Sequence, residues 1–314
     1  MNILEIDHLS KSFGAAHVIR DLTFAVPEHT VFGFVGRNGA GKTTTMKMIL
    51  GFMRPSAGTI RIAGEPVRYG STPTNRFIGY LPDVPEFYGY LSAREYLRLC
   101  GRVVGLNTDA INLKSTELLG LVGLDGVKKR IGSYSRGMKQ RLGVAQALMN
   151  DPRILICDEP TSALDPAGRR DILEILAQAK TRTTVLFSTH ILSDVEAICD
   201  AVGVLNDGVL ALEGNLELLK AQRRTDTIEL ELADESRIAE TAKLLKRIGH
   251  VDQVSVAGAV IQLLITSKDA ATAILSALLA ANTAINRFEV LEPTLEDIFL
   301  ETTGPEKTRL ETTR

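Results

Sequence analysis

The sequence is poor in cysteine and has no cysteine pattern that could carry a fold. Its 314 residues include three cysteines, Cys100, Cys157 and Cys199, each far from the others and set among apolar residues. An odd number of widely spaced cysteines does not make a complete disulfide framework, and the spacing is not that of a zinc site. We therefore expect reduced thiols in the core of an intracellular protein.

Excess charge and long hydrophobic runs are also lacking. The 36 basic and 38 acidic side chains leave a formal charge of -2, without the basic surplus that nucleic-acid binding favours. The most apolar segment, 270–281, is too short and too rich in alanine to cross a bilayer. Residues 1–7 alternate like a strand, so no secretory signal is predicted. We expect no nucleic-acid partner, and any membrane-spanning part must come from another chain.

One glycine-rich motif is complete. Residues 36–44 read Gly-Arg-Asn-Gly-Ala-Gly-Lys-Thr-Thr, between an apolar run at 31–35 that is typical of a buried strand and a helical run at 45–50. This is the phosphate-binding P-loop pattern, in the order of strand, loop and helix that the pattern requires. That context favours a triphosphate site over a glycine-rich turn that only caps a helix.

The residue types of the motif suit a nucleotide with a magnesium ion. Glycines let the backbone turn its N–H groups toward phosphates, and the helix that follows points its positive end at the same anion. Lys42 can reach the β- and γ-phosphates, and the hydroxyl of Thr43 is a hard oxygen ligand of the kind that magnesium prefers. The predicted nucleotide-binding residues of this stretch are Gly36, Asn38, Gly39, Ala40, Gly41, Lys42, Thr43 and Thr44.

Two later apolar runs end in polar residues. The run 153–157 is followed by Asp158 and Glu159, and the run 183–188 is followed by Thr189 and His190. Parallel strands deliver such residues to the carboxyl edge of a sheet, where ligands of α/β folds bind. We predict that Asp158 holds the magnesium ion, that Glu159 accepts a proton from the attacking water and that His190 contacts the γ-phosphate.

Two other features allow more than one interpretation from the residues alone. Phe13 precedes the P-loop and is either a half-buried core residue or a ring that stacks on adenine. Ser135 precedes a helical run that contains Gly137, and this start is either an ordinary helix cap or a second turn facing phosphate. The residues themselves favour the ordinary interpretation in both cases.

The chain is predicted to divide into two domains. Residues 1–222 form an α/β nucleotide-binding domain, in which 92–150 read as a mostly helical subdomain. Strands and helices from 226 to 303 follow the order of a small ferredoxin-like α+β unit. Residues 222–225 are the predicted linker, and the polar tail 304–314 is expected to be disordered.

In this order the motifs resemble those of the nucleotide-binding subunit of an ATP-binding cassette (ABC) transporter, over nearly the whole chain. In that family a P-loop is followed by a glutamine loop, a signature sequence usually Leu-Ser-Gly-Gly-Gln, an acidic strand, a D-loop and a switch histidine. The corresponding positions here are the loop at Asp83, the stretch from Tyr134 to Met138, the pair Asp158 and Glu159, the turn at Asp165, and His190. Six short motifs in one order make the resemblance specific.

The resemblance implies a fold and a chemistry. The fold is an α/β P-loop NTPase with a RecA-like core, an N-terminal antiparallel β subdomain and a helical subdomain, followed by the α+β domain. The implied cofactors are ATP and Mg²⁺, and the implied metal ligands are Thr43, Asp158 and Asp83. The implied catalytic residues are Glu159, His190 and Asp83. Phe13 takes the adenine-stacking place that Tyr usually holds, which reverses the preference stated above.

The resemblance also implies a second copy of the chain. Cassettes of this family pair head to tail, so that Ser135 and Gly137 of one copy face the γ-phosphate held by Lys42 of the other. Asp165 is expected among the nucleotide-binding residues of the same arrangement. One P-loop and one signature in the sequence therefore imply a homodimer closed by ATP.

Departures from the family pattern point to one branch. Asp83 stands where glutamine is usual and cannot donate a hydrogen bond when ionised, while Arg136 and Met138 replace Gly and Gln of the signature. With the ending at 292–299, these features look like the ATPases of ABC-2 type exporters, which work with a separate membrane permease. This implies a peripheral protein at the cytoplasmic face of the cell membrane. Residues 83–96 are expected beside the groove that receives a permease helix, although their aromatic content fits a core role equally.

Two other classes of function stay open at this point. A soluble ABC ATPase acting on ribosomes or DNA usually has two cassettes or a long coiled coil, and this sequence has neither feature. A P-loop kinase of nucleotides or small molecules lacks the signature and the switch histidine. A neighbouring gene for a protein with about six membrane-spanning segments would favour export.

Overall fold

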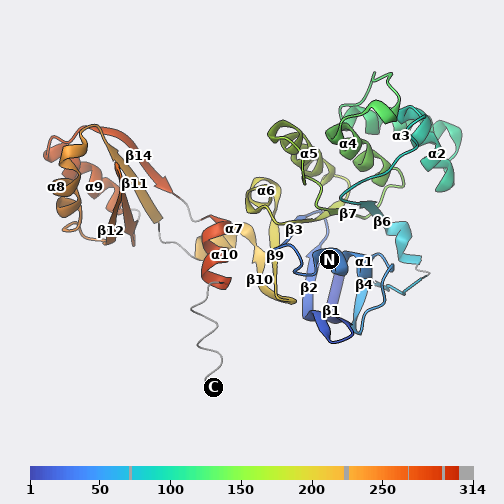
Figure 1. Cartoon of the computed structure of the whole chain (residues 1–314), viewed down its shortest axis with the longest axis horizontal. Coiled ribbons are helices and arrows are strands. Elements are labelled where there is room, and N and C mark those ends of the chain that lie inside the picture. Colours follow the sequence, from blue (N-terminus) through green and yellow to red (C-terminus); the bar gives the residue numbers. More distant parts are fainter. Residues whose placement is uncertain (71–72, 223–225, 268, 292–293, 304–314) are drawn as a thin grey trace. The chain divides into compact units, whose positions relative to one another are not determined.

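The P-loop strand lies within the parallel half of a large mixed sheet. In this computed structural model, which describes residues 1–70, 73–222, 226–267, 269–291 and 294–303, the ten strands of the sheet run in the order β5-β4-β1-β2-β10-β9-β3-β8-β7-β6 (Figure 1). The parallel strands are β9 (Ala201–Asn206), β3 (Val31–Gly36), β8 (Thr184–Thr189), β7 (Ile154–Asp158) and β6 (Ile78–Leu81). Strands β3, β7 and β8 are buried along their whole length, as expected of parallel strands covered on both faces.

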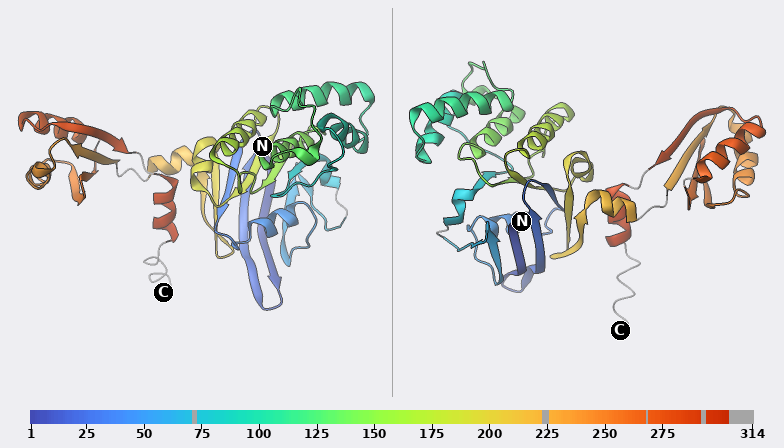
Figure 2. Two further views of the ribbon diagram at one scale, coloured as in Figure 1. Left: turned by 45° about the horizontal axis from the view of Figure 1, so that its top comes forward. Right: turned by 180° about the vertical axis from the view of Figure 1, so that it is seen from behind.

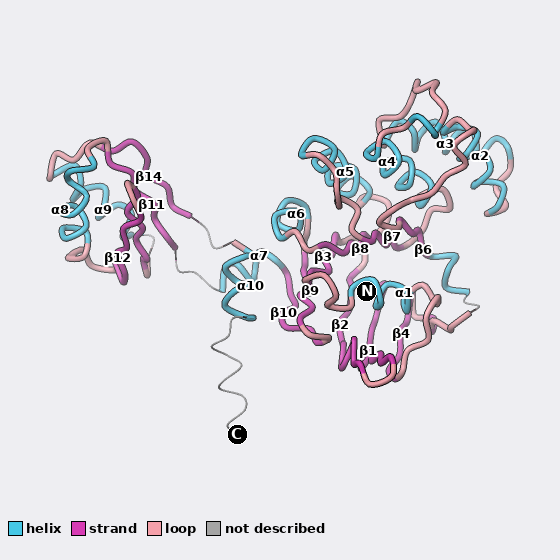
Figure 3. Tube along the Cα trace, viewed as in Figure 1, coloured by secondary structure: helices cyan, strands magenta, loops and turns pink. Residues whose placement is uncertain are grey.

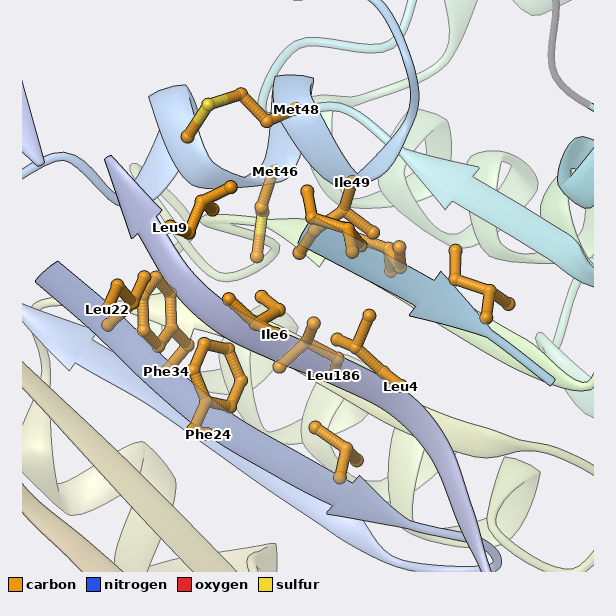
Figure 4. Close-up of a cluster of buried hydrophobic side chains, with 14 of the residues drawn as sticks. Leu4, Ile6, Leu9, Leu22, Phe24, Phe34, Met46, Met48, Ile49 and Leu186 are labelled. Atoms are coloured by element: carbon orange, nitrogen blue, oxygen red, sulfur yellow. The ribbon is translucent and has the colours of Figure 1, made fainter. Parts of the chain in front are cut away.

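The other half of the sheet is mostly antiparallel. Its strands are β1 (Asn2–Phe13), β2 (Ala16–Pro27), β4 (Ala57–Ile62), β5 (Glu65–Pro66) and β10 (Val209–Asn215). The long hairpin of β1 and β2, blue in Figure 2, packs its apolar side chains against helix α1 (Lys42–Ile49). Figure 4 shows Met46 and Ile49 of this helix above Ile6 of β1 and Phe34 of β3. The P-loop helix is therefore fixed by a core that joins both halves of the sheet.

Helices cover the parallel strands and extend beyond them. A helical region contains α2 (Ala93–Val103), α3 (Thr108–Leu121) and α4 (Arg136–Ala147), with a short 3₁₀ turn, η2 (Ile131–Ser133), before α4. The first of these helices begins with a capping box, in which the Glu95 amide donates to Ser92 Oγ at 3.3 Å and the Ser92 amide donates to Glu95 Oε2 at 2.8 Å. The remaining helical elements of this unit are η1 (Pro73–Phe77), α5 (Pro166–Ala179) and α6 (Leu192–Ile198).

The chain separates into two compact units, 1–216 and 217–314. The second unit contains a four-stranded antiparallel sheet (Figure 3) with the strand order β12-β13-β11-β14. Its elements are α7 (Leu216–Gln222), β11 (Asp226–Leu232), η3 (Glu235–Arg237), α8 (Ile238–Leu245), β12 (Val251–Ala257), β13 (Val260–Ile265), α9 (Asp269–Ala280), β14 (Ile285–Leu291) and α10 (Leu295–Thr303). From β11 to β14 the order of elements and strands is that of a ferredoxin-like fold, as predicted.

Alternate residues of these strands explain the packing of the second unit. Ile228 and Leu230 of β11 and Leu263 of β13 are buried against Ile274 and Leu278 of α9. On β11, the residues that alternate with Ile228 and Leu230 point to the other face of the sheet and are polar or charged, as the period of two requires. The predicted linker residues 223–225 and the predicted disordered tail at 304–314 lie outside the described residues. Within the described part of the chain, no helix is both long enough and apolar enough to cross a membrane.

Candidate nucleotide-binding site

The P-loop has the backbone conformation that its glycines allow. Gly39 and Gly41 have φ angles of 84° and 109°, in a region that residues with side chains rarely adopt. A Cβ atom at Gly41 would lie 2.4 Å from Ile19 Cδ1, and one at Gly36 would lie 2.7 Å from the carbonyl oxygen of Leu205. Gly41 therefore needs glycine for space as well as for conformation, and Gly36 needs it for space.

Lys42 is buried at the centre of the site. Its ammonium donates to the carbonyl oxygen of Gly36 at 2.6 Å, and its Nζ lies 3.1 Å from Oε1 of Glu159. The side chain is 6% exposed, so these contacts are only weakly screened by water. The P-loop lysine thus faces the acidic residue that the sequence predicts to be the catalytic base.

The strand end at Asp158 presents oxygen ligands of the kind that a magnesium ion takes. Thr43 Oγ1 donates to Asp158 Oδ1 at 3.3 Å, which places the hydroxyl and the carboxylate side by side. Ser188 Oγ donates to the same carboxylate oxygen at 2.7 Å. A hydroxyl next to a carboxylate is a set of hard donors that fits Mg²⁺. Thr43 and Asp158, two of the three predicted metal ligands, are therefore brought together.

Glu159 is held in an unusual backbone conformation. Its φ angle is 47°, which is strained for a residue with a side chain, and its amide donates to both the carbonyl oxygen and Oγ of Ser188. The turn aims the carboxylate at Lys42 on one side and at His190 on the other, where Nδ1 lies 2.9 Å from Glu159 Oε2. An ionised carboxylate only accepts, so this contact requires the proton on Nδ1.

A cavity of about 320 Å³ opens over these residues. It is lined by Val18, Asn38, Gly39, Gly41, Lys42, Thr43, Thr44, Asp83, Glu159, Ser162 and His190. Four loops that are distant in the sequence thus meet at one edge of the sheet, because β3, β6, β7 and β8 run in the same direction and end there. Phe13 is 49% exposed at the end of β1 and does not line this cavity.

Asp83, which also lines the cavity, has both acidic and basic neighbours. Burial raises the pKa of its carboxyl above the usual value, and the negative charges of Asp158 and Glu159 add to the rise. The guanidinium of Arg136, whose Nη2 lies 3.6 Å from Asp83 Oδ1, opposes it. Asp83 therefore joins the acidic residues of the site and has a cationic neighbour outside it.

The remaining predicted residues lie away from the cavity of their own chain. Ser135 caps α4, where its Oγ accepts from the Met138 amide at 3.2 Å, and Asp165 caps α5, where its carboxylate accepts from the Gly168 amide at 3.1 Å. Gly137 has open space where a Cβ would be. None of the three lines the P-loop cavity.

Two groups that organise the site were not predicted from the sequence. Ser188 is completely buried and contacts both Asp158 and Glu159; its signal was a second polar residue near the end of a strand that leads to His190. Asp194 is also buried, accepts from Thr161 Oγ1 at 2.7 Å and forms an ion pair with Arg169. This contact joins the turn after Glu159 to the helix after His190, and no local pattern marks it.

Comparison with known proteins agrees with this geometry. Residues 19–162 match the family model described as ABC transporter, and residues 214–303 match the one described as ATP-binding protein DrrA1-3-like, C-terminal domain. The ABC transporter ATP-binding protein YxlF of Bacillus subtilis (strain 168) is 38% identical over 95% of this chain and 98% of its own length. The bacitracin transport ATP-binding protein BcrA of Bacillus licheniformis is 39% identical over 75% of this chain and 76% of its own. The linearmycin resistance ATP-binding protein LnrL of Bacillus subtilis (strain 168) is 30% identical over 96% of this chain and 98% of its own length.

Solved structures give the same assignment for the larger unit. The structure of an ATP-binding subunit of an ABC transporter, 33% identical, covers 70% of this chain and 92% of its own with a TM-score of 0.62. The structure of cbiO1 from Clostridium perfringens, described as part of the ABC transporter complex cbiONQ, is 26% identical, with coverage of 71% and 92% and a TM-score of 0.65. The chain therefore belongs to the ABC transporter ATP-binding family, whose members are ATPases that drive transport, in the branch with a DrrA1-3-like C-terminal domain.

Proposed function

We propose that the chain is the ATP-hydrolysing subunit of an ABC-2 type exporter, which forms a dimer on binding ATP and drives efflux through a separate permease. The observation that carries the catalytic part is the placement of the Glu159 carboxylate between Lys42 and His190 at the P-loop cavity. A phosphate site, a base and a switch residue are thereby within contact of one another, as phosphoryl transfer to water requires.

Each side chain of the site has a defined role in this proposal. Lys42 and the P-loop amides bind the β- and γ-phosphates, and Glu159 accepts the proton of the attacking water. His190 contacts the γ-phosphate, as the sequence predicts, and its contact with Glu159 holds that carboxylate in place. Thr43 and Asp158 would hold Mg²⁺, with Asp83 near enough to act through water. The ion would supply positive charge to the phosphate oxygens.

The positions of the signature residues support a second copy. Ser135 and Gly137 stand at the N-terminal turn of α4 and Asp165 at that of α5, outside the cavity of their own chain. Two helix N-termini that present amides and small side chains suit the phosphates of another molecule. We propose that Ser135, Gly137 and Asp165 contact the nucleotide that is held by the partner copy. We also propose that Phe13, at the end of β1, stacks on the adenine.

The export part of the proposal rests on a groove and on the relatives. A second cavity of about 430 Å³ is lined by Asp83, Val84, Pro85, Glu86, Phe87, Gly89, Ile131, Gly132, Arg136 and Lys139. Next to it, Tyr88 and Tyr90 are 55% and 71% exposed, with their ring centroids 5.9 Å apart. We propose that a helix of the permease docks here, at the cytoplasmic face of the membrane. The relatives named for bacitracin transport and linearmycin resistance favour export of an antibiotic-like compound.

The domain division is part of the same proposal. We place the ATP-binding domain at 1–222, with its helical subdomain at 92–150, and the accessory domain at 226–303. The compact units divide earlier, between Leu216 and Glu217, which places most of α7 in the second unit, and the core of the β11-to-β14 sheet supports a separable second domain.

Co-purification from the native membrane tests the function directly. The tagged chain, captured after mild detergent extraction and analysed by mass spectrometry, should bring with it an integral membrane protein with about six spanning segments. ATP hydrolysis by that complex should exceed hydrolysis by the isolated chain. Recovery of ribosomal proteins or DNA in place of a membrane protein would contradict the export proposal.

A further inference from the structure

One residue forms part of the wall of both cavities. Asp83 lines the nucleotide cavity together with Thr43 and Glu159, and it also lines the groove together with Arg136 and Lys139. Among the described residues that line the two cavities, no other is shared. The position of its carboxylate is therefore open to influence from both sides.

Two contacts fasten Asp83 to the first turns of α4. The side-chain amide of Gln140, which is fully buried, donates to the backbone carbonyl of Asp83 at 2.7 Å. Arg136, one turn earlier on the same face of the helix, places Nη2 3.6 Å from Asp83 Oδ1. That carboxylate oxygen is enclosed and has no hydrogen bond, so Arg136 is the opposite charge that accompanies it.

The charges on the two sides of Asp83 pull in different directions. Toward the nucleotide cavity its neighbours are the carboxylates of Asp158 and Glu159, which repel it unless a cation is bound between them. Toward the groove its neighbour is the guanidinium of Arg136, which attracts it. A cation held by Thr43 and Asp158 would compete with Arg136 for this carboxylate.

We propose that Arg136 is a positioning residue for Asp83, through which the start of α4 sets the strength of cation binding at the metal site. Arg136 holds the Asp83 carboxylate back from the metal site and so limits how strongly Asp83 supports the cation. The inference rests on the proposed magnesium site and deepens it, because it adds a residue from outside the nucleotide cavity.

Metal affinity in five variants tests the link without measuring turnover. Each variant carries Glu159→Gln to stop hydrolysis and is held in excess over ATP, while the EPR signal of free Mn²⁺, which takes the same oxygen ligands as Mg²⁺, reports binding. Arg136→Gln should tighten Mn²⁺ binding by about three- to fivefold, the size of a partly exposed ion pair. Asp83→Asn should weaken it by about tenfold or more, as loss of a supporting ligand does.

The order of the effects is the decisive part. In the double variant Asp83→Asn with Arg136→Gln, the affinity should equal that of Asp83→Asn alone, because Arg136 acts only through the carboxylate. Arg136→Lys should restore most of the unmodified affinity. Lys139→Gln removes one positive charge from the same groove and helix and serves as the matched control, with a shift of less than about twofold expected.

Two results would overturn the link. Arg136→Gln could tighten binding equally in the presence and absence of Asp83, or Lys139→Gln could produce the same shift as Arg136→Gln; either would show a general charge effect. A different failure would concern the proposed site itself: if Mn²⁺ does not bind to the ATP-loaded chain more tightly than to ATP in solution, the metal site is wrong, and the link falls with it.

Discussion

Ser188 donates a 2.7 Å hydrogen bond from Oγ to Asp158 Oδ1, and the same hydroxyl accepts the backbone amide of Glu159 at 3.0 Å. One buried side chain on β8 therefore sets the direction of both acidic residues at the end of β7, Asp158 and Glu159. Because Glu159 has a positive φ, its conformation needs such fixation from a neighbouring strand.

Ser188→Ala tests this arrangement. Loss of a hydrogen bond to a charged group should lower the free energy of unfolding by about 1–3 kcal/mol. We expect the rate of ATP hydrolysis to fall by about tenfold, with a smaller change in ATP affinity, because orientation of the acids is lost while the P-loop is intact. Urea unfolding and steady-state ATPase kinetics measure the two effects.

Ser115→Ala is the matched control for this change. Ser115 lies on α3, is 1% exposed and has an Oγ without a hydrogen-bond partner among the described contacts. Removal of an unsatisfied buried hydroxyl should leave stability equal or slightly higher, and hydrolysis unchanged. Equal loss of hydrolysis in the two variants would contradict a specific role for Ser188.

Alanine substitutions at two P-loop glycines distinguish the effect of backbone strain from that of steric crowding. Gly39→Ala meets open space but keeps a φ of 84°, and it should cost about 1 kcal/mol of stability. Gly41→Ala adds a Cβ 2.4 Å from Ile19 Cδ1 as well, and it should cost about 2–4 kcal/mol. Thermal or urea unfolding without nucleotide measures both. A smaller loss at Gly41 than at Gly39 would show that the loop relaxes around Ile19.

Local sequence patterns predicted the elements that carry the site. The hydrogen bonds and ion pairs that connect these elements are visible only in the folded chain. The P-loop, Asp158, Glu159 and His190 are each marked by a run of strand or helix residues beside them, and parallel strands must bring their ends together. The roles of Ser188 and Asp194 and the pairing of Asp83 with Arg136 depend on contacts between residues that are at least 25 positions apart. The separation is 25 for Asp194 with Arg169 and 53 for Asp83 with Arg136. A sequence contains no local signal for such contacts.

The ferredoxin-like unit was predictable for a related reason. Its strands alternate apolar and polar residues, and its helices have turn residues at their ends. The hydrophobic period of each segment and the order of the segments along the chain are therefore enough to predict the fold. The functional assignment of Ser135, Gly137 and Asp165 could not follow from one chain, because these residues lie outside the cavity they are proposed to complete.

Truncation tests the proposed division into domains. A chain that ends at Arg224 keeps every described residue of the nucleotide cavity and all of α7, so we expect it to fold and to bind ATP with an affinity within about threefold of the full chain. Equilibrium binding of a fluorescent ATP analogue checks this. Loss of all nucleotide binding in a folded protein would show that the accessory domain contributes to the site.

The central claim is that Glu159 is the base of a site that two copies complete around ATP. Glu159→Gln keeps the size of the side chain but cannot accept the proton of water, so ATP should bind, hydrolysis should fall by about 100-fold or more, and the dimer should persist. Glu174→Gln, an exposed glutamate on α5, is the control and should hydrolyse ATP normally without a lasting dimer.

The most direct measurement is light scattering of the Glu159→Gln protein with Mg²⁺ and ATP. We expect a mass twice that of the 34.1 kDa chain, and a return to the single mass when ATP is removed. A Glu159→Gln protein that binds ATP but stays at the mass of one chain, or that hydrolyses ATP at the unmodified rate, would contradict it.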